Sequence, residues 1–443
     1  AQTCDSSCCD SNAGCCDQSN CDALGCDCGG CESACGISDA FALFSCDAAG
    51  CSGSCRCRDR LFGDLMGPKA PYAKCVVADL ELTQFFQGVS SGGSQRDFEY
   101  GGKLDYMFTF AGGLVTMHAE TRFGESIGAS EAGALTFANS NMLYPLPNQQ
   151  VTSITGLLVN VPLGERMVIS AGKLNSLDFW TMVYPQVGRG VEGFMNLNAL
   201  SAGLPWLRYV NLSENAAGLL VMNDQKQIQG GLMVFDLNNS TTTSGISELF
   251  NDGVGLLGVW RFFTNLGGKP GSHLFAGGWS SRTYTSLDPN DWYFIPGQNG
   301  GLTPGEHTGA WTFAYSGEQV LWQDPCDSNR KTQFWTGWSL SDGNPSFGRW
   351  GGFASIESWG PLPGRSQDRM GIAYFYNQLS SDVKQLVNTL PNENIQNIHG
   401  GEVYYNYTMT PFSKLTFDLQ AIDNANVSDD VAVVLGARWH LQL

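Results

Sequence analysis

Charge is scarce in this chain, and so are long apolar runs. Only 15% of the 443 residues are Asp, Glu, Lys or Arg, against about 25% in typical soluble proteins. No stretch of about 18 apolar residues occurs, which excludes a helical membrane span. Basic residues are outnumbered, 24 Lys and Arg against 42 Asp and Glu, and the net charge of −18 argues against nucleic acid as a partner.

Signatures of catalysis are missing as well. The chain has no Gly-x-Ser-x-Gly, no His-Glu-x-x-His and no phosphate loop. Its five histidines are scattered and match no metal-ligand spacing. Carboxylates such as Glu120 and Glu318 could form a glycosidase pair, but the sequence gives no distance between them. We therefore expect no enzyme activity, no cofactor and no metal centre formed by the histidines.

Glycine and aromatic residues are abundant, at 55 copies and 12% of the chain. They occur in segments of alternating polarity, of which the end of the chain, 398–443, is the clearest example. In its last run Leu435 and Trp439 share an apolar face and Arg438 lies on the other; in the run before it, Phe417 and Asp418 separate in the same way. Since successive side chains of a strand point to opposite faces, these runs predict an antiparallel meander with one apolar and one ionic face.

Alternating segments recur from residue 75 onward. About sixteen can be distinguished, an even number, as in single-chain bacterial outer-membrane barrels. We expect strands near 75–88, 97–110, 113–124, 151–162, 166–175, 206–222, 227–237, 254–265, 272–284, 308–321, 331–341, 347–358, 367–378, 399–409, 413–422 and 431–443.

The expected links between these strands alternate between short and long. Short turns are expected at 111–112, 162–165, 223–226, 265–271, 323–330, 360–368 and 410–412. Longer links are expected at 125–150, 176–205, 238–253, 285–307 and 379–398, with 89–96 and 423–430 as shorter members of the same set. Short periplasmic turns and long outer loops are typical of an outer-membrane barrel, so residues 75–443 are predicted to form a barrel of about sixteen antiparallel strands in that membrane.

Residues 1–74 have a different composition. Fourteen of the 16 cysteines lie before residue 60, in doublets and tight clusters separated by Asp and Gly, with too few apolar residues for a core. Such a segment requires cross-links or metal to be ordered. The spacing lacks a regular zinc repeat, and an exported chain meets an oxidising compartment, so we expect a disulfide-stapled module with little regular structure; thiolate metal clusters are the alternative. The first residues, Ala-Gln-Thr, are typical of a mature start after cleavage.

Cysteine parity suggests a tether between this module and the barrel. Fifteen cysteines, the last of them Cys75, are an odd number, and Cys326 makes the number even. We therefore predict that Cys326 pairs with a cysteine of the first 75. If residue 75 starts at the periplasmic end, the turn that contains Cys326 lies at that end too, so the module would hang in the periplasm.

Several segments resemble the carbohydrate-selective porins of the OprB type. The resemblance begins at LFGDLMG, residues 61–67, continues over LVNVPLGERMVISAGKLNSLDFW, residues 158–180, and includes GPLPGRSQDRMGIAYFYNQLS, residues 360–380, and GGEVYYNYTMTPFSKLTFDLQ, residues 400–420. It covers about residues 60–443 and implies a sixteen-stranded barrel for passive diffusion of sugars. The cysteine-rich module departs from the family pattern, as does the final residue, Leu443, where such barrels usually end in an aromatic.

Candidate pore residues follow from the strand expected at 113–124. His118, Glu120 and Arg122 share its polar face with Thr116. Paired Arg and carboxylate groups can form hydrogen bonds that replace those a sugar loses when it leaves water. The resemblance implies a basic residue at the constriction, for which Arg122 is the first choice. The long link 176–205 could fold inward and narrow the pore, which adds the candidates Lys173, Asp178, Arg189 and Glu192. The alternative is that these charges form lumenal ion pairs that set barrel shape rather than selectivity.

Three functions are compatible with these features. The first is a porin for small hydrophilic solutes, with sugars as permeating solutes, outer-membrane lipid as surroundings and a homotrimer as the expected assembly. The second is a structural envelope protein whose module cross-links neighbouring copies or grips the cell wall, with the barrel as anchor. The third is a soluble all-β protein that binds or hydrolyses carbohydrate. The exposure of the two strand faces decides between a barrel in lipid and a soluble fold.

Overall fold

The structure is a computed structural model. It describes residues 26–28, 55–57, 60–61, 75–147, 149–296, 301–325, 327–390 and 394–443. Most of the cysteine-rich module predicted for residues 1–74 lies outside these residues, apart from residues 60–61 and the short paired strands β1 (Cys26–Cys28) and β2 (Cys55–Cys57). Whether the module is a separate, disulfide-stapled unit stays a prediction.

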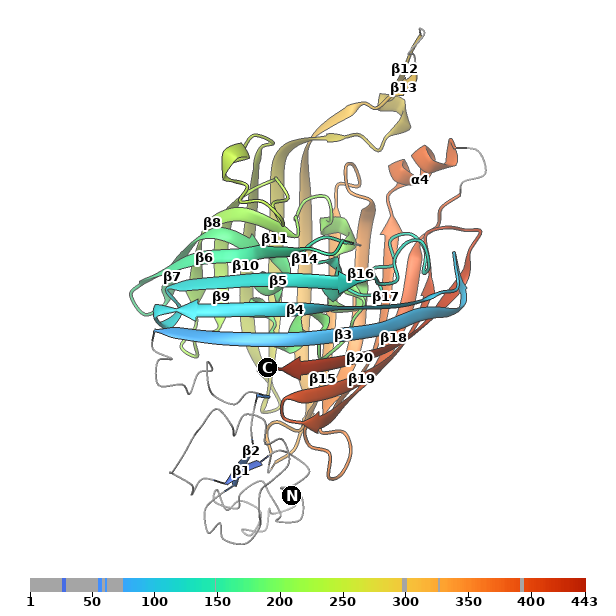
Figure 1. Ribbon diagram of the computed structural model, residues 1–443. Helices are drawn as coiled ribbons and strands as arrows, with labels where there is room; N and C mark the ends of the chain where they lie inside the picture. Colours follow the sequence, from blue (N-terminus) through green and yellow to red (C-terminus); the bar gives the residue numbers. More distant parts are fainter. Residues whose placement is uncertain are drawn as a thin grey trace.

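Sixteen antiparallel strands close into one barrel, which confirms the predicted fold (Figure 1). Each strand pairs with the next in sequence, and the last pairs with the first to close the ring. The strands are β3 (Val76–Gly93), β4 (Phe98–Phe110), β5 (Val115–Gly124), β6 (Thr152–Leu163), β7 (Met167–Asn175), β8 (Ser213–Met222), β9 (Ile228–Asp236), β10 (Val254–Leu266), β11 (Lys269–Thr285), β14 (Glu306–Gln323), β15 (Lys331–Ser341), β16 (Gly348–Trp359), β17 (Arg369–Leu379), β18 (Ile398–Thr410), β19 (Ser413–Asp423) and β20 (Asp430–Gln442).

Exposed aromatic and aliphatic side chains cover the outer surface of these strands, and the buried ionic side chains face the interior. Phe417 and Trp439 are 54% and 41% exposed on the outer surface, whereas Asp418 and Arg438 are 5% and 1% exposed. A soluble protein would place these residues the other way round, because exposing aromatic rings to water in this number is unfavourable. An outer surface of this kind suits hydrocarbon, and the ionic interior suits a water-filled lumen.

The two ends of the barrel differ in the length of their links. At one end, here called the turn end, all links are short: 111–114, 164–166, 223–227, 267–268, 324–330, 360–368 and 411–412. At the other, here called the loop end, the links are 94–97, 125–151, 176–212, 237–253, 286–305, 342–347, 380–397 and 424–429. The five expected long links are therefore all at the loop end, whereas the loop-end links 94–97, 342–347 and 424–429 are as short as the turns. The link 286–305 carries the hairpin of β12 (Tyr293–Ile295) and β13 (Gly301–Thr303), and 380–397 carries α4 (Ser381–Asn388), both at the top of Figure 1.

Two strand boundaries differ by five residues or more from the sequence-based expectation, and the others differ by at most three. The strand predicted at 206–222 begins only at Ser213, so the preceding link extends to residue 212 rather than 205. Its apolar side chains resemble a strand in composition, but the turn Leu204–Trp206 carries Pro205 and packs inside the barrel. Conversely, β3 extends to Gly93 instead of ending at residue 88, because its last residues continue to pair with β20.

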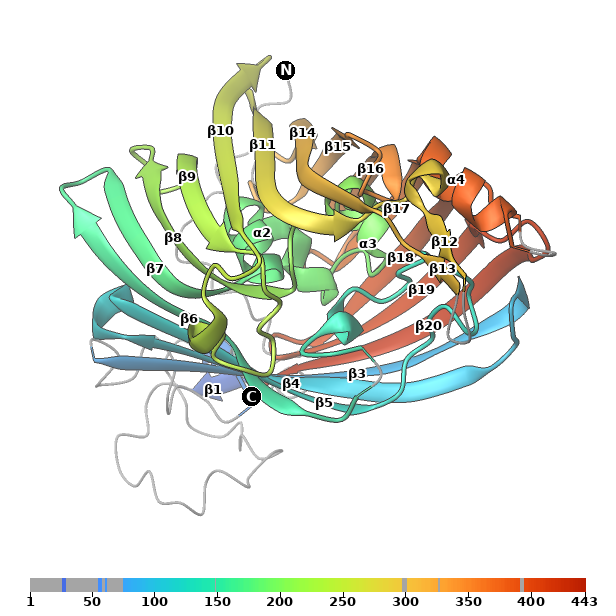
Figure 2. The ribbon, with the colours of Figure 1, turned by 90° about the horizontal axis from the view of Figure 1, so that it is seen from above.

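The link between β7 and β8, residues 176–212, folds into the barrel; it is called the inward segment below. Figure 2 shows its helices α2 (Ser176–Val183) and α3 (Leu197–Leu200) inside the ring of strands. Between them lies a 3₁₀ turn, Pro185–Gly190. The described helices are all too short or too polar to cross a bilayer.

The chain enters the barrel at the turn end. Leu61 N–H donates to the carbonyl of Gln442 at 2.9 Å, and Arg60 pairs with Asp79 at 3.2 Å. Cys75 has a free, exposed thiol. Cys326 lies outside the described residues, so the predicted tether through Cys326 stays a prediction.

Candidate functional site

The inward segment starts with a helix that is capped and anchored by one residue. Asn175, the last residue of β7, accepts hydrogen bonds through its side chain from the backbone N–H groups of Leu177 and Asp178, at 3.0 and 3.2 Å. Such a cap satisfies N–H groups that the first helical turn leaves unpaired. The Asn175 amide also donates to Glu120 on β5 at 3.2 Å. Helix α2 is thereby fixed relative to the barrel wall.

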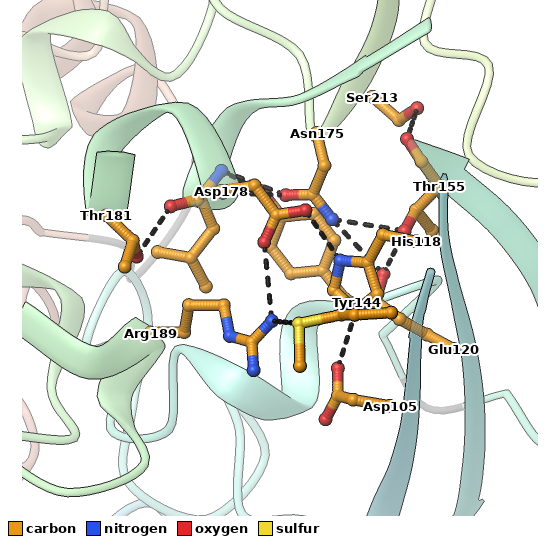
Figure 3. A network of polar contacts seen from close by, with 12 residues as sticks. Asp105, His118, Glu120, Tyr144, Thr155, Asn175, Asp178, Thr181, Arg189 and Ser213 are labelled. Atoms are coloured by element: carbon orange, nitrogen blue, oxygen red, sulfur yellow. Dashed lines mark hydrogen bonds and ion pairs between the residues drawn. The ribbon is translucent and has the colours of Figure 1, made fainter. Parts of the chain in front are cut away.

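A histidine connects that wall to α2. His118, on β5, lies between two carboxylates: its Nδ1 is 2.6 Å from Asp178 of α2, and its Nε2 is 2.8 Å from Asp105 of β4 (Figure 3). With an acceptor at each ring nitrogen, the imidazole can satisfy both only in its doubly protonated form. The pKa of Asp178 lies below its usual range because, although burial opposes ionisation, the neighbouring His118 outweighs it. His118 and Asp178 thus form an ion pair between the wall and the inward segment.

A buried lysine completes the charge balance on the wall. Lys103 Nζ is 2.5 Å from Glu120 and 3.1 Å from Asp105. Asp105, His118 and Glu120 lie close enough together to hold a metal ion. The Lys103 ammonium, however, already supplies a positive charge to both carboxylates. The geometry therefore favours an ionic network over a metal centre.

Arg189 links the inward segment to β3, the strand that pairs with β4. Its guanidinium pairs with Glu81 of β3 at 2.7 Å and lies 3.6 Å from Asp178. Its pKa is raised because these carboxylates outweigh the effect of burial. Arg189 also has a positive φ of 51°. Glu81, Asp178 and Arg189 form one side of a polar lumenal cavity of about 500 Å³.

The lining of this polar cavity includes five of the predicted pore residues. They are His118, Lys173, Asp178, Arg189 and Glu192. Lys173 Nζ donates to the backbone carbonyls of Ile154 and Thr243, at 2.6 and 2.7 Å. The cavity is also lined by residues near the turn end that sequence reasoning had not selected: Asp79, Glu81, Thr116, His440 and Gln442.

The other two predicted pore residues are not among those lining the polar cavity. Glu120 is enclosed by Lys103, Asn175 and Thr155. Arg122 is 1% exposed, and its guanidinium donates to the Leu146 carbonyl at 2.8 Å and to the Ser126 hydroxyl at 3.1 Å. Arg122 therefore supports the link 125–151, which folds over it.

A second set of wall residues holds the middle of the inward segment from β18–β20. Glu402 accepts hydrogen bonds from the N–H groups of Met195 and Asn196, at 2.5 and 2.9 Å. Arg438 donates to the carbonyls of Gly190 and Gly193, the latter at 2.8 Å. Because both side chains bind backbone groups, the path of the segment is fixed here independently of its side chains.

Glu192 lies on the same stretch and pairs with Lys414 of β19. Burial disfavours the Glu192 carboxylate, but the Lys414 ammonium outweighs it and lowers the pKa of Glu192 to about 2. The carboxylate is therefore ionised at neutral pH, and it lines the polar cavity.

The lumen wall opposite these charges is mainly apolar where it contacts the inward segment. Trp335 of β15 packs against Tyr184 and Trp180 of the inward segment, with ring centroids 5.6 and 6.4 Å apart, and against Phe353 of β16 at 4.8 Å. Arg261 of β10 donates to the Val183 carbonyl at 2.5 Å and covers the Tyr184 ring at 4.2 Å. The inward segment thus has an ionic contact side and an apolar contact side.

Sequence reasoning missed Glu81, Lys103, Asp105, Glu402 and Arg438 as parts of the site. Strand alternation puts each of them on the polar face, as it does His118. The missing information is the path of the inward segment, since Arg189 reaches Glu81 across 108 positions of sequence.

The chain is similar to a known protein family and, in fold, to a solved outer-membrane structure. A family model described as carbohydrate-selective porin, OprB family, matches residues 102–443. The structure of Pseudomonas putida OprB at high pH is similar, with a TM-score of 0.71 and 14% identity over 87% of this chain and 99% of that one. The outer membrane protein opdK of Pseudomonas aeruginosa matches with a TM-score of 0.45 and 10% identity, over 83% and 98% of the two chains. No curated protein sequence matches. The chain belongs to the OprB family of carbohydrate-selective porins.

Proposed function

We propose that this chain is an outer-membrane channel for passive diffusion of small carbohydrates, with the polar cavity as its constriction. The observation that carries the proposal is the inward segment, which crosses a lumen that is ionic on one side and leaves a cavity lined by charges of both signs. The barrel's outer surface of exposed aromatic and aliphatic side chains supports a location in the lipid bilayer.

The polar cavity offers a sugar both partners that its hydroxyl groups require. Arg189 supplies guanidinium N–H donors, and Glu81, Asp178 and Glu192 supply carboxylate acceptors. A hydroxyl group that leaves water can therefore form hydrogen bonds in the cavity, so the free energy of desolvation is offset. Since these charges already bind one another, no single group holds the sugar strongly, and the sugar can leave again.

Planar bilayer recordings test this function. We expect purified protein to produce discrete conductance steps that D-glucose reduces reversibly. Arg189→Gln should weaken the block by glucose several-fold, because it removes a charged donor from the cavity. Arg166→Gln is the matched control, because Arg166 is 64% exposed and pairs with Asp224 away from the lumen. An absence of steps, or steps that sugar does not change in the wild-type protein, would overturn the proposal.

The expected tether and assembly are proposed on separate grounds. Cys75, exposed beside the turn end, suits a disulfide with another copy or with the module. Placement of the module in the periplasm follows if the short turns of this barrel face that compartment. Mass spectrometry tests the tether, which a free thiol at Cys326 would contradict. Non-reducing electrophoresis tests the assembly: oligomers that a reductant dissociates would favour cross-linking of the envelope.

A further inference from the structure

A second cavity, of about 220 Å³, lies in the barrel between the inward segment and the apolar wall. On the wall side it is bounded by inward-facing residues of β10, β11, β14, β15 and β16: Leu257, Val259, Leu274, Ala276, Ala314, Gly337 and Phe353. On the other side lie Trp180 and Trp206 of the inward segment. The two cavities share Leu174 and Phe179 as lining residues, so they are neighbours inside the lumen.

The lining of this apolar cavity contrasts with that of the polar cavity. Among the described residues that line it, only Glu214 is charged, and its carboxylate accepts hydrogen bonds from Asn211 at 3.2 and 3.3 Å. The indole N–H of Trp180 is bound to the Leu200 carbonyl, at 3.2 Å. The ring therefore offers the cavity its apolar surface. Because most of the lining is apolar, a free sugar would replace few of the hydrogen bonds to water that it loses here.

The size of the apolar cavity suits one ring. Packed interiors contain few voids larger than a water molecule, and an apolar cavity of about 150 Å³ is known to remain dry and to bind benzene. At about 220 Å³, the apolar cavity is somewhat larger, and tryptophan and phenylalanine rings at its border favour stacked or edge-on contacts with another aromatic ring.

We propose that the apolar cavity is a subsite for the aromatic ring of an aryl glycoside, whose sugar portion occupies the adjoining polar cavity. The proposal deepens the proposed function, because it rests on passage of sugars through the same lumen and adds that sugars with an aromatic substituent are preferred. Burial of the ring provides affinity without a charged contact.

Titration of the tryptophan fluorescence of purified protein with phenyl β-D-glucoside and with methyl β-D-glucoside tests the subsite. The two probes carry the same sugar and differ only in the ring. We expect the phenyl glucoside to alter the emission, since Trp180 and Trp206 border the cavity, with a half-saturating concentration about tenfold or more below that of the methyl glucoside. Equal half-saturation for both probes would overturn the proposal.

A variant in which a larger side chain fills the apolar cavity tests the same subsite. Ala314 of β14 lines the cavity, and Ala314→Phe should bring the two half-saturating concentrations together. Ala354→Phe is the control, because Ala354 is an exposed alanine on the outer face of β16. An equal effect of both substitutions would contradict the subsite. Ala276→Phe on β11 repeats the test if the first variant lacks the heat-modifiable mobility of a folded barrel.

The readouts separate this proposal from the proposed function. Conductance steps that glucose blocks, together with equal binding of the two glucosides, would retain the channel and reject the subsite. Ring-dependent quenching without any conductance would retain the subsite and reject the channel.

Discussion

Asp368 is the polar centre of the turn between β16 and β17. Its buried carboxylate accepts two hydrogen bonds from Arg365, at 2.7 and 2.8 Å, one from the Tyr405 hydroxyl at 2.5 Å and one from the Thr408 N–H at 3.0 Å. Gly364 precedes Arg365 with a φ of 73°, a conformation that favours glycine. The Pro-Gly-Arg-x-x-Asp block that marks the family resemblance is therefore a structural turn.

We predict that Asp368→Asn lowers the free energy of unfolding by about 1 to 3 kcal/mol, because an amide group cannot accept all four donors. Urea unfolding in detergent micelles measures this. Asp224→Asn should change it by less than about 0.5 kcal/mol, since Asp224 is a turn aspartate that pairs with an arginine but is 77% exposed. Equal effects of the two variants would contradict the assigned role.

In the wild-type protein, protonation of Asp368 at acid pH should cause the same loss of folding stability. Burial opposes ionisation of Asp368, but the hydrogen bonds from Arg365 and its other donors place its pKa below the usual range. A carboxyl group whose pKa is lower in the folded state than in the unfolded state stabilises the fold at pH values above its unfolded pKa of about 3.9. This contribution is lost as the pH falls through the folded-state pKa. The stability difference between wild type and Asp368→Asn should therefore narrow only below about pH 4.

Individual site residues were partly predictable from sequence. Strand alternation places His118 on the inner face, and its position in the link made Asp178 a candidate, yet nothing in the sequence shows that the two meet at 2.6 Å. Arg122 has the same alternation signal as His118 but is covered by a neighbouring link. Alternation predicts the face of a residue, whereas exposure to the lumen depends on which links fold over it. The roles of these residues in passage stay predictions.

The inward segment is the element on which both cavities depend. Its helices and 3₁₀ turns are short, and its position is set by contacts with the wall. Glu402 and Arg438 bind its backbone on one side, and apolar packing around Trp335 holds the other.

We predict that Glu402→Gln loosens the segment, because an amide leaves one of the N–H groups of Met195 and Asn196 without its acceptor, at about 1 to 3 kcal/mol. Trypsin should then cleave after Arg189 at least about fivefold faster, and single-channel current should become noisier. Glu248→Gln changes an exposed glutamate on another link and serves as the control. Unchanged cleavage and current in Glu402→Gln would contradict the anchoring role.

The long strands and the inward fold of the link after β7 were predictable, whereas the path of that link and its end at residue 212 were not. Alternation defines β18–β20 nearly to the residue, because a lipid-facing side and a lumenal side leave little freedom of register. Residues 204–212 are apolar for a different reason: they pack within the barrel. Apolar composition alone cannot distinguish these two environments, so the start of β8 was placed several residues too early.

At the scale of the whole molecule, the polarity of a soluble protein is reversed. We predict that Phe417→Arg, near the middle of β19, lowers folding stability in phospholipid vesicles by about 2 to 4 kcal/mol, because it places a charge in hydrocarbon. Val431→Arg, also exposed but at the loop end of β20, should cost at most about 1 kcal/mol. Equal losses for the two variants would be incompatible with a lipid-spanning band centred on the strands.

The pairing of β20 with β3 sets an order on biogenesis. A ring sealed by its first and final strands exposes two unpaired edges until the last residues arrive. The inward segment contacts both strands of this closing pair, β3 through Glu81 and β20 through Arg438. A chain that lacks its last strand therefore cannot make all the contacts that hold the segment. A nascent polypeptide must therefore be kept from aggregating over its entire length, and loss of even the terminal strand should abolish both the seal and the internal fold.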